Sequence, residues 1–218
     1  MSHFTVAVFT ENGDLDQVDK LLAPFQENNM GDCPKEYLTF TEDEDFDVDE
    51  ETGKRGYWEN PNAKWDWYQV GGRAHGLLIA KPEKTGTLGS PSFLGRGAES
   101  GEYDSMKVAD IDFDAMRDRA KRNLEPFESC WERKWYKPEY FQKRYPDVET
   151  YVRTKTEFST YACITPEGEW HAMGTMGWFG VDGADPKDHI AFSDAYAEKF
   201  IKPAIESGWY MTIVDCHI

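Results

Sequence analysis

Four side chains suited to acid–base chemistry stand in three separate stretches of the chain. Asp215 and His217 alternate in a β-rich segment, so they share a face if that segment is a strand. Joined by His75 or His171, they would form a general base or part of a zinc site. The competing interpretation is structural, with polar residues at the end of a sheet and a His171 ring stacked between its neighbours. No spacing typical of a metal site, an activated nucleophile or a phosphate-binding loop is present, so we expect no bound metal.

The most distinctive stretch is Tyr57–Gly76 (YWENPNAKWDWYQVGGRAHG), which holds three of the eight tryptophans. If its middle forms a strand, Trp65 and Trp67 share one face. Gly71-Gly72 then allows a backbone with φ > 0 or the close approach of another group. Arg73 follows at once, where its guanidinium can bind a carboxylate or a phosphate.

Two interpretations of this stretch remain open. In one, the tryptophans belong to the core and Arg73 pairs with a buried acid such as Asp66. In the other, indole rings and Arg73 surround a planar or phosphorylated ligand, because aromatic faces stack bases at about 1–3 kcal/mol each. The ligand-binding candidates under the second interpretation are Trp65, Trp67, Arg73, Trp170 and Trp178.

Acidic residues dominate the charge of the 218-residue chain. There are 41 Asp and Glu against 24 Lys and Arg, which gives a formal net charge of −17. A nucleic-acid backbone is bound through a local excess of Lys and Arg, so we expect no direct contact with one. A small nucleotide in a pocket stays compatible with this charge, and so does an acidic surface that mimics DNA or fills a basic groove of another protein.

Two segments are expected to form long loops. The acidic run at 42–51 (EDEDFDVDEE) is most simply a solvated loop. Calcium binding and partner steering are the alternatives, although the glycine and the spacing of the usual calcium loop are missing. The Gly/Ser-rich run at 86–101 (GTLGSPSFLGRGAESG) is either a flexible insertion or a lid to which Arg96 supplies charge.

Hydrophobic periodicity predicts one α+β domain over residues 1–218. The strand-like runs are 3–10, 77–80, 156–166 and 209–217, and the helical patterns are 14–22, 113–135 and a segment beginning at Pro186. Asp14 is the expected cap of the first helix, and Pro126 should break the second. A hairpin should lead from 156–166 into Trp170. Strands at the two ends of a chain often pair centrally, so we expect an antiparallel or mixed β-sheet with helices packed mainly on one face.

Cysteine usage and hydropathy bear on location. The four cysteines are widely spaced without a C-x-x-C pair, and no signal peptide opens the chain. We therefore expect reduced thiols and a cytoplasmic protein. No run approaches ~18 consecutive apolar residues, so we expect no membrane span and no membrane partner.

Four blocks of the sequence resemble a family of uncharacterised proteins from tailed bacteriophages and prophages. The blocks are LLAPFQEN, NPNAKWDWYQVGGR, ITPEGEWHAMGTMGWFG and TIVDCHI, and the resemblance covers most of the chain. It implies a phage protein in the host cytoplasm, but it assigns no catalytic residues because the family has no settled biochemical role. The chain departs from the family at Ala74, where relatives generally have a tryptophan. If that ring closes a pocket, this chain binds its ligand less well.

Three hypotheses of function follow. The first is a phage accessory protein that acts on a small nucleotide-type ligand to counter host defence signalling, either by binding it alone or by also cleaving it through acid–base chemistry. The second is an acidic inhibitor of a host defence protein, or a DNA mimic, with no small-molecule site. The third is a virion or assembly component. We favour the first because clustered glycine, arginine and tryptophan have a specific use in a pocket. No cofactor motif is recognisable.

Overall fold

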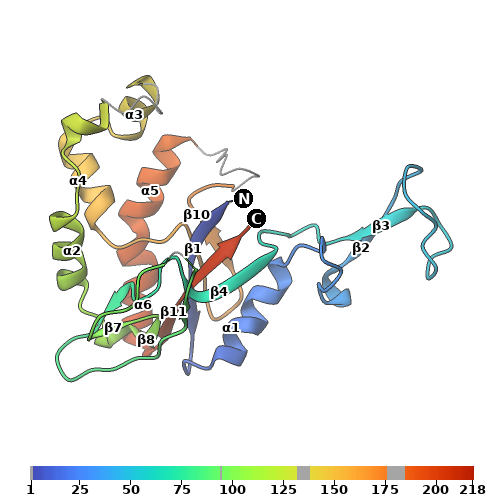
Figure 1. Cartoon of the computed structure of the whole chain (residues 1–218), viewed down its shortest axis with the longest axis horizontal. Helices are drawn as coiled ribbons and strands as arrows, with labels where there is room; N and C mark the ends of the chain where they lie inside the picture. Colours follow the sequence, from blue (N-terminus) through green and yellow to red (C-terminus); the bar gives the residue numbers. More distant parts are fainter. Residues whose placement is uncertain (1, 94, 132–137, 176–184) are drawn as a thin grey trace.

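The two ends of the chain meet in the centre of one β-sheet. The computed structural model describes residues 2–93, 95–131, 138–175 and 185–218, and in it the first and last strands lie side by side (Figure 1). β1 (His3–Thr10) and β11 (Tyr210–His217) pair antiparallel along their full length. Both strands are almost entirely buried, because apolar residues occupy both of their faces. The predicted central pairing of the terminal strands is confirmed.

Five further strands complete a seven-stranded mixed sheet. They are β4 (Trp67–Gly72), β6 (Ser90–Pro91), β8 (Ser105–Lys107), β9 (Ala162–Ile164) and β10 (Trp170–Ala172). The order is β10-β9-β1-β11-β4-β6, with β8 pairing to the other half of β11. β9 and β10 form the expected hairpin, and β9 runs parallel to β1. The strand expected over 156–166 is wrong in its first half: a helix extends to Thr156, residues 157–161 are irregular, and β9 begins only at Ala162.

Helices cover the sheet unequally, as the α+β prediction required. α1 (Leu15–Leu22) packs alone on one face, and Asp14 caps it by accepting from the N–H of Asp16. The other layer consists of α2 (Phe113–Arg122), α4 (Val148–Thr156), α5 (Pro186–Tyr196), a π-helical turn (Ala197–Ile201) and α6 (Lys202–Ser207), with α3 (Pro138–Arg144) at its end. Short 3₁₀ turns occupy Ala23–Phe25, Lys35–Tyr37, Val108–Asp110 and Phe127–Trp131.

The second predicted helix is shorter than its apolar pattern. α2 begins after Asp112, whose carboxylate accepts from the N–H of Ala115, and ends at Arg122. Pro126 follows, and the chain resumes only as a 3₁₀ turn, which is the break expected of a proline without a free N–H. The remaining residues of the pattern, 132–135, lie outside the described part of the chain.

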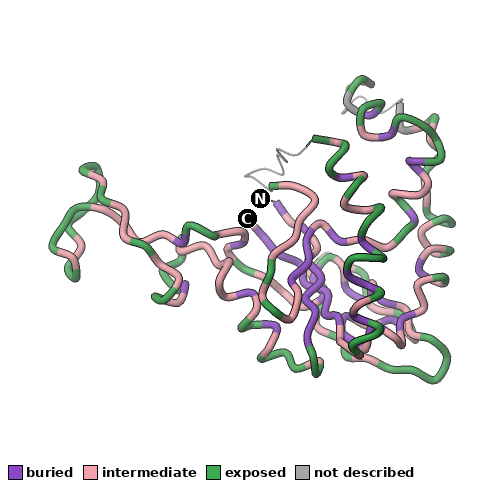
Figure 2. The backbone as a smooth tube through the Cα atoms, turned by 180° about the vertical axis from the view of Figure 1, so that it is seen from behind, coloured by how far each residue is buried: buried purple, intermediate pink, exposed green. Residues whose placement is uncertain are grey.

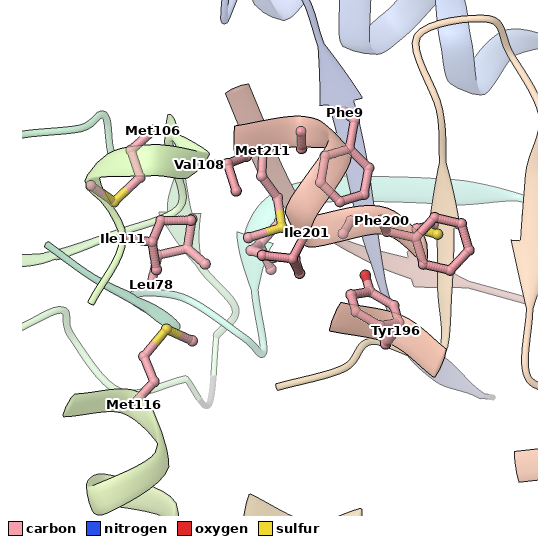
Figure 3. Close-up of a cluster of buried hydrophobic side chains, with 14 residues drawn as sticks. Phe9, Leu78, Met106, Val108, Ile111, Met116, Tyr196, Phe200, Ile201 and Met211 are labelled. Atoms are coloured by element: carbon pink, nitrogen blue, oxygen red, sulfur yellow. The ribbon is translucent and has the colours of Figure 1, made fainter. Parts of the chain in front are cut away.

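Two hydrophobic cores lie on the two faces of the sheet. In the larger one, Phe9 and Met211 from the central strands meet Tyr196, Phe200 and Ile201 from the helical layer (Figure 3). The smaller core under α1 is built from Phe4, Val6, Val8, Val18, Leu22, Trp65, Ala162, Ile164, Val214 and Cys216. Each large buried side chain contributes roughly 1.5–3 kcal/mol, so these cores fix the orientation of every strand that carries a site residue.

A two-stranded arm projects from the body (Figures 1 and 2). It is formed by β2 (Thr39–Glu42) and β3 (Gly56–Glu59), and the acidic run forms most of the connection between them. Its base is fixed by Asn60, whose buried side-chain amide donates to the carbonyl oxygens of Pro24 and Gln26 at 2.9 Å each. The chain therefore folds as one body with one protruding hairpin.

The Gly/Ser-rich run passes close to the body of the sheet. It contains β6, and the short strand expected at 77–80 appears as β5 (Leu78–Ile79), paired with β7 (Glu102–Tyr103). Arg96 binds Glu102 at 2.6 Å and the carbonyl oxygen of Gly76 at 3.2 Å. The charge of Arg96 is thus used to hold the loop in place.

Candidate functional site

Three histidine–aspartate pairs are arranged along β11. The Nδ1 atom of a histidine lies against a carboxylate oxygen in His217–Asp66 (2.6 Å), His3–Asp215 (3.0 Å) and His75–Asp104 (2.7 Å). Asp215 and His217 belong to β11, the N–H of Asp66 donates to the carbonyl of His217, and the N–H of Ile213 donates to the carbonyl of Asp104. The backbone of β11 therefore sets the spacing of the three pairs.

The two ring nitrogens of His217 differ in their contacts with the described residues. An ionised carboxylate only accepts hydrogen bonds, so Nδ1 carries the proton donated to Asp66, and Nε2 of the neutral ring is left as an acceptor. The residue is 5% exposed, and among the described residues Nε2 has no hydrogen-bond partner. An imidazole that a carboxylate orients through Nδ1, and whose Nε2 can still accept a proton, has the arrangement of a general base.

His3 supplies a second oriented imidazole beside the first. It lies opposite His217 across the β1–β11 pair, and the two ring centroids are 5.0 Å apart in an edge-to-face arrangement. Asp215 holds Nδ1 of His3 with one oxygen and accepts the backbone N–H of Arg73 at 2.9 Å with the other. Gly72 makes this approach possible, because a Cβ there would lie 2.4 Å from the Cβ of Asp215.

Trp67 covers these imidazoles on the solvent side. Its ring is stacked on His217 with centroids 5.1 Å apart and 18° between the planes, and His3 meets its edge at 5.4 Å. The side chain is 43% exposed, so part of the indole stays open to solvent. We call His3, Asp66, Trp67, Asp215 and His217 the His–Asp cluster.

His75 belongs to a different, fully enclosed pair. Asp104 is 0% exposed, and besides His75 it accepts the N–H groups of Gly76 (2.6 Å) and Gly89 (2.8 Å). Gly71 lies directly over this carboxylate, where a Cβ would be 2.6 Å from Oδ2. His75 thus stabilises the turn that follows β4 and lies outside the His–Asp cluster.

The candidate tryptophans are divided between the two faces of the sheet. Trp65 lies in the smaller core and donates to the carbonyl of Leu22 at 3.1 Å, so the expectation that it shares a face with Trp67 is wrong. The physical reason is that β4 begins only at Trp67. Trp170 also lies on the α1 side, where it lines a cavity of about 260 Å³ with Phe4, Tyr161 and Lys64. Trp178 lies outside the described residues.

His171 does not reach the His–Asp cluster. It pairs with Cys163 in the β9–β10 hairpin, three strands away from β11, which corresponds to about 14 Å at the usual strand spacing. Its ring lies 5.1 Å from that of Phe200, and its Nε2 is 3.3 Å from a carboxylate oxygen of Glu169. The geometry fits the structural interpretation of this residue.

Arg73 stands at the rim of the cluster. Its backbone is tied to Asp215, but its side chain is exposed and has no ion pair or hydrogen bond with any described residue. The pairing with Asp66 considered from the sequence is absent there, because Asp66 is occupied by His217. Burial, together with the nearby charge of Asp66, raises the pKa of Glu27. The cluster is therefore acidic beneath its imidazoles, with one cation at its edge.

Three of the cysteines are placed unfavourably for a nucleophile. Cys33, Cys163 and Cys216 are free and buried. Burial raises the pKa of Cys163 to about 12, and burial raises that of Cys216 well above its ordinary value. Within the described ranges, no group of three or more His, Cys, Asp or Glu side chains is placed to hold a metal ion.

Sequence reasoning missed three of the residues that organise this region. His3 pairs with Asp215 across 212 positions of the chain, and no local pattern signals such a contact. Asp66 was considered only as a partner for Arg73. Asp104 was not considered, although the glycines that make room for it were.

Comparisons with known proteins assign no function to the site. No protein-family model matches the chain, and no curated protein or solved structure is significantly similar to it. In the described part of the chain, no helix is both long and apolar enough to cross a membrane.

Proposed function

We propose that the His–Asp cluster binds a small nucleotide-type ligand and cleaves a phosphoester bond in it by acid–base chemistry. The observation that carries this proposal is the buried Nε2 of His217, which has no hydrogen-bond partner in the described part of the chain while Asp66 holds Nδ1. A buried polar atom without a partner costs about 1–3 kcal/mol, so a site that keeps one calls for a use.

Each component has a role in this chemistry. His217 accepts a proton from the attacking hydroxyl or water through Nε2 as the new P–O bond forms. His3, in its protonated form and held by Asp215, donates a proton to the leaving oxygen as the old P–O bond breaks. If a hydroxyl of the ligand attacks, the two imidazoles exchange roles when water opens the cyclic ester that results. If water attacks, His217 releases its proton to solvent and His3 takes one up, so the protons balance in both cases.

Recognition would use the groups on the solvent side of the cluster. The exposed part of Trp67 offers a surface on which a base can stack. Arg73 can bind a phosphate in two-point fashion, because its guanidinium is exposed and not engaged by described residues. As part of the same proposal, we expect such an activity to counter host defence signals, a role that the sequence resemblance to phage proteins favours.

A nucleotide panel tests the proposal directly. Mono-, di- and cyclic nucleotides are titrated while tryptophan fluorescence is recorded, and product formation is followed by anion-exchange chromatography. We expect saturable binding of at least one ligand and turnover of it. His217→Gln should lower turnover by about 10²–10⁴-fold, the usual contribution of a general base.

His171→Gln is the matched control. It removes the same functional group from the same sheet, but from the position three strands away. We expect its turnover to equal that of the unaltered chain, while Trp67→Leu weakens binding about tenfold through lost stacking. Absence of any response across the panel, or equal losses in His171→Gln and His217→Gln, would contradict the proposal.

The projecting arm favours a second candidate function, docking onto a basic protein. Its connection at 43–55 carries seven acidic and two basic side chains, and Phe46 and Val48 are 45% and 56% exposed there. The tip is preformed, since Asp49 accepts from the N–H of Thr52 and from the indole of Trp58. A basic groove with an apolar socket complements such a tip.

Separate variants distinguish the two functions. Changing Asp45, Asp47 and Glu50 to their amides should abolish salt-sensitive binding to a basic partner. Arg73→Ala should leave that binding intact and should weaken nucleotide binding instead. If both sets of variants affect one activity alike, the arm and the His–Asp cluster serve the same function.

A further inference from the structure

A pocket with cationic walls lies where three helices of the outer layer meet. α3, α4 and α5 gather at the end of that layer away from the arm (Figure 1). The cavity between them has a volume of about 80 Å³. We call it the basic pocket and define it by Arg144, Thr154, Lys155, Ser159, His189 and Ser193.

The charge of this pocket is opposite to that of the whole molecule. No Asp or Glu belongs to its described lining, although the chain carries a net charge of −17. Two carboxylates close in sequence to lining residues are engaged elsewhere: Glu157 binds Arg117 and Asp194 binds Arg153, both at 2.7 Å. Within the described chain, the ammonium of Lys155 consequently has no carboxylate partner.

The cations are gathered around one aromatic ring. The Nζ of Lys155 lies 5.6 Å and the Cζ of Arg144 lies 5.8 Å from the ring centroid of the buried Tyr145. The Nη2 of Arg144 donates to Nδ1 of His189 at 3.3 Å, which leaves the proton of the neutral imidazole on Nε2. Two cationic side chains therefore reach the lining of one pocket, and a bound anion would be attracted to both of them.

Hydroxyl groups complete the set of donors. The Oγ atoms of Ser159 and Ser193 lie 3.0 Å apart. Since one hydroxyl donates to the other, one proton of the pair remains for a further acceptor. The hydroxyl of Thr154 already donates to the carbonyl of Thr150 at 2.7 Å, so Thr154 lines the pocket without donating to a ligand.

We infer that the basic pocket is a binding site for a tetrahedral oxyanion, either inorganic phosphate or the phosphate of a monoester. Its volume of about 80 Å³ corresponds to two or three waters at about 30 Å³ each. That space suits one phosphate group and is too small for a nucleoside. The pocket shares no residue with the His–Asp cluster, so this inference stands apart from the proposed function.

Calorimetric titration with inorganic phosphate, at constant ionic strength in chloride, tests the site. We expect saturable binding, with a Kd at least about tenfold higher in Lys155→Gln. Ser193→Ala should raise the Kd less, because it removes a neutral donor. A parallel titration with methyl phosphate identifies the source of the phosphate group: tighter binding than inorganic phosphate indicates a monoester, and weaker binding indicates the free ion.

Two controls make the result specific. Lys143→Gln removes the same charge from an exposed lysine next to Arg144 that does not line the pocket, and it should keep the original Kd. His217→Gln should also keep it, which separates this site from the His–Asp cluster. The inference is overturned if phosphate shows no saturable binding. It is equally overturned if Lys155→Gln and Lys143→Gln behave alike, or if His217→Gln alone abolishes the binding.

Discussion

At the residue scale, two adjacent glycines decide whether the buried carboxylates can approach the backbone. Gly71 and Gly72 have φ values of +82° and +54°, and carboxylates of Asp104 and Asp215 occupy the space that their side chains would fill. The two glycines therefore leave room for carboxylates from elsewhere in the chain. The sequence indicated that Gly71-Gly72 lets another group approach closely, but two glycines alone do not show which side chain will fill the space.

Replacing Gly71 with alanine should destabilise the fold through collision as well as strain. Gly101 is the matched control, because its φ of +85° is nearly the same and nothing lies within 4 Å of its Cβ position. We expect Gly101→Ala to cost about 1 kcal/mol of unfolding free energy. Gly71→Ala should cost roughly 1–3 kcal/mol more, since the new Cβ meets Asp104 and the ring of His75. Equal urea midpoints for the two variants would contradict this account.

From the environment of Glu102 we predict that the unfolding free energy falls in acid. Burial alone would raise its pKa, but hydrogen bonds from Arg96 and from the N–H of Glu99, with the charge of Arg119, lower it below the ordinary value. A depressed carboxyl pKa stabilises the fold above the unfolded value, about pH 4.3, and this contribution is lost as the pH falls further.

Glu102→Gln should therefore reduce the unfolding free energy at pH 7 by about 1.5–3 kcal/mol, the range for hydrogen bonds to charged groups. The difference from the unaltered chain should shrink as the pH falls below about 4.3. Urea unfolding at a series of pH values measures it. Glu99→Gln is the control, because that exposed side chain can change while its backbone N–H still binds Glu102. A difference that stays constant with pH would rule out the mechanism.

At the element scale, local patterns were sufficient for the central strands and insufficient for the site. β1, β11 and α1 appear within one residue of their expected bounds, since each combines strong periodicity with a clear cap or turn. Alternation also placed Asp215 and His217 on one face. The position of Trp65 depended on where β4 begins, and that is set by the hydrogen bond between Asp66 and the end of β11.

The arm should be dispensable for the stability of the body. β2 and β3 pair with each other and with no strand of the main sheet, and Glu42 stands opposite Gly56 in their register. Residues 43–55 can therefore be replaced by Asn-Gly, which forms a two-residue hairpin turn. We expect the unfolding free energy to change by less than about 1 kcal/mol, because none of the described core residues lies in 43–55.

Asn60→Ala provides the contrast at the base of the same arm. The Asn60 side chain is buried, and its loss removes the amide donor from the carbonyl of Pro24 and leaves the carbonyl of Gln26 with the weak thiol donor of Cys33. This should cost about 1–3 kcal/mol. If shortening the hairpin were as damaging as Asn60→Ala, the arm would have to be treated as part of the folding unit.

At the scale of the whole molecule, the excess of acidic side chains is distributed unevenly. The connection at 43–55 carries a net charge of −5, and the basic pocket lies at the far end of the helical layer. The arm is therefore the negative end of the molecule. The basic pocket lies far enough from the arm to be little affected by that negative charge. Long-range repulsion from the arm falls off within a Debye length of about 8 Å at physiological salt.

The uneven charge leads to a prediction about salt. Self-repulsion among 17 excess negative charges opposes the compact state, and added salt screens it, while individual surface ion pairs lose only about 0–1 kcal/mol each. We expect the urea midpoint to rise between low salt and about 1 M NaCl, where the Debye length is about 3 Å. The hairpin-shortened variant keeps a net charge of −12, so its midpoint should rise in the same direction by a smaller amount. Repeating the series with KCl checks that screening, rather than binding of one cation, is responsible.

A midpoint that falls with salt would mean that the ion pairs outweigh the net charge. An equal rise in both chains would mean that the arm adds nothing to the repulsion.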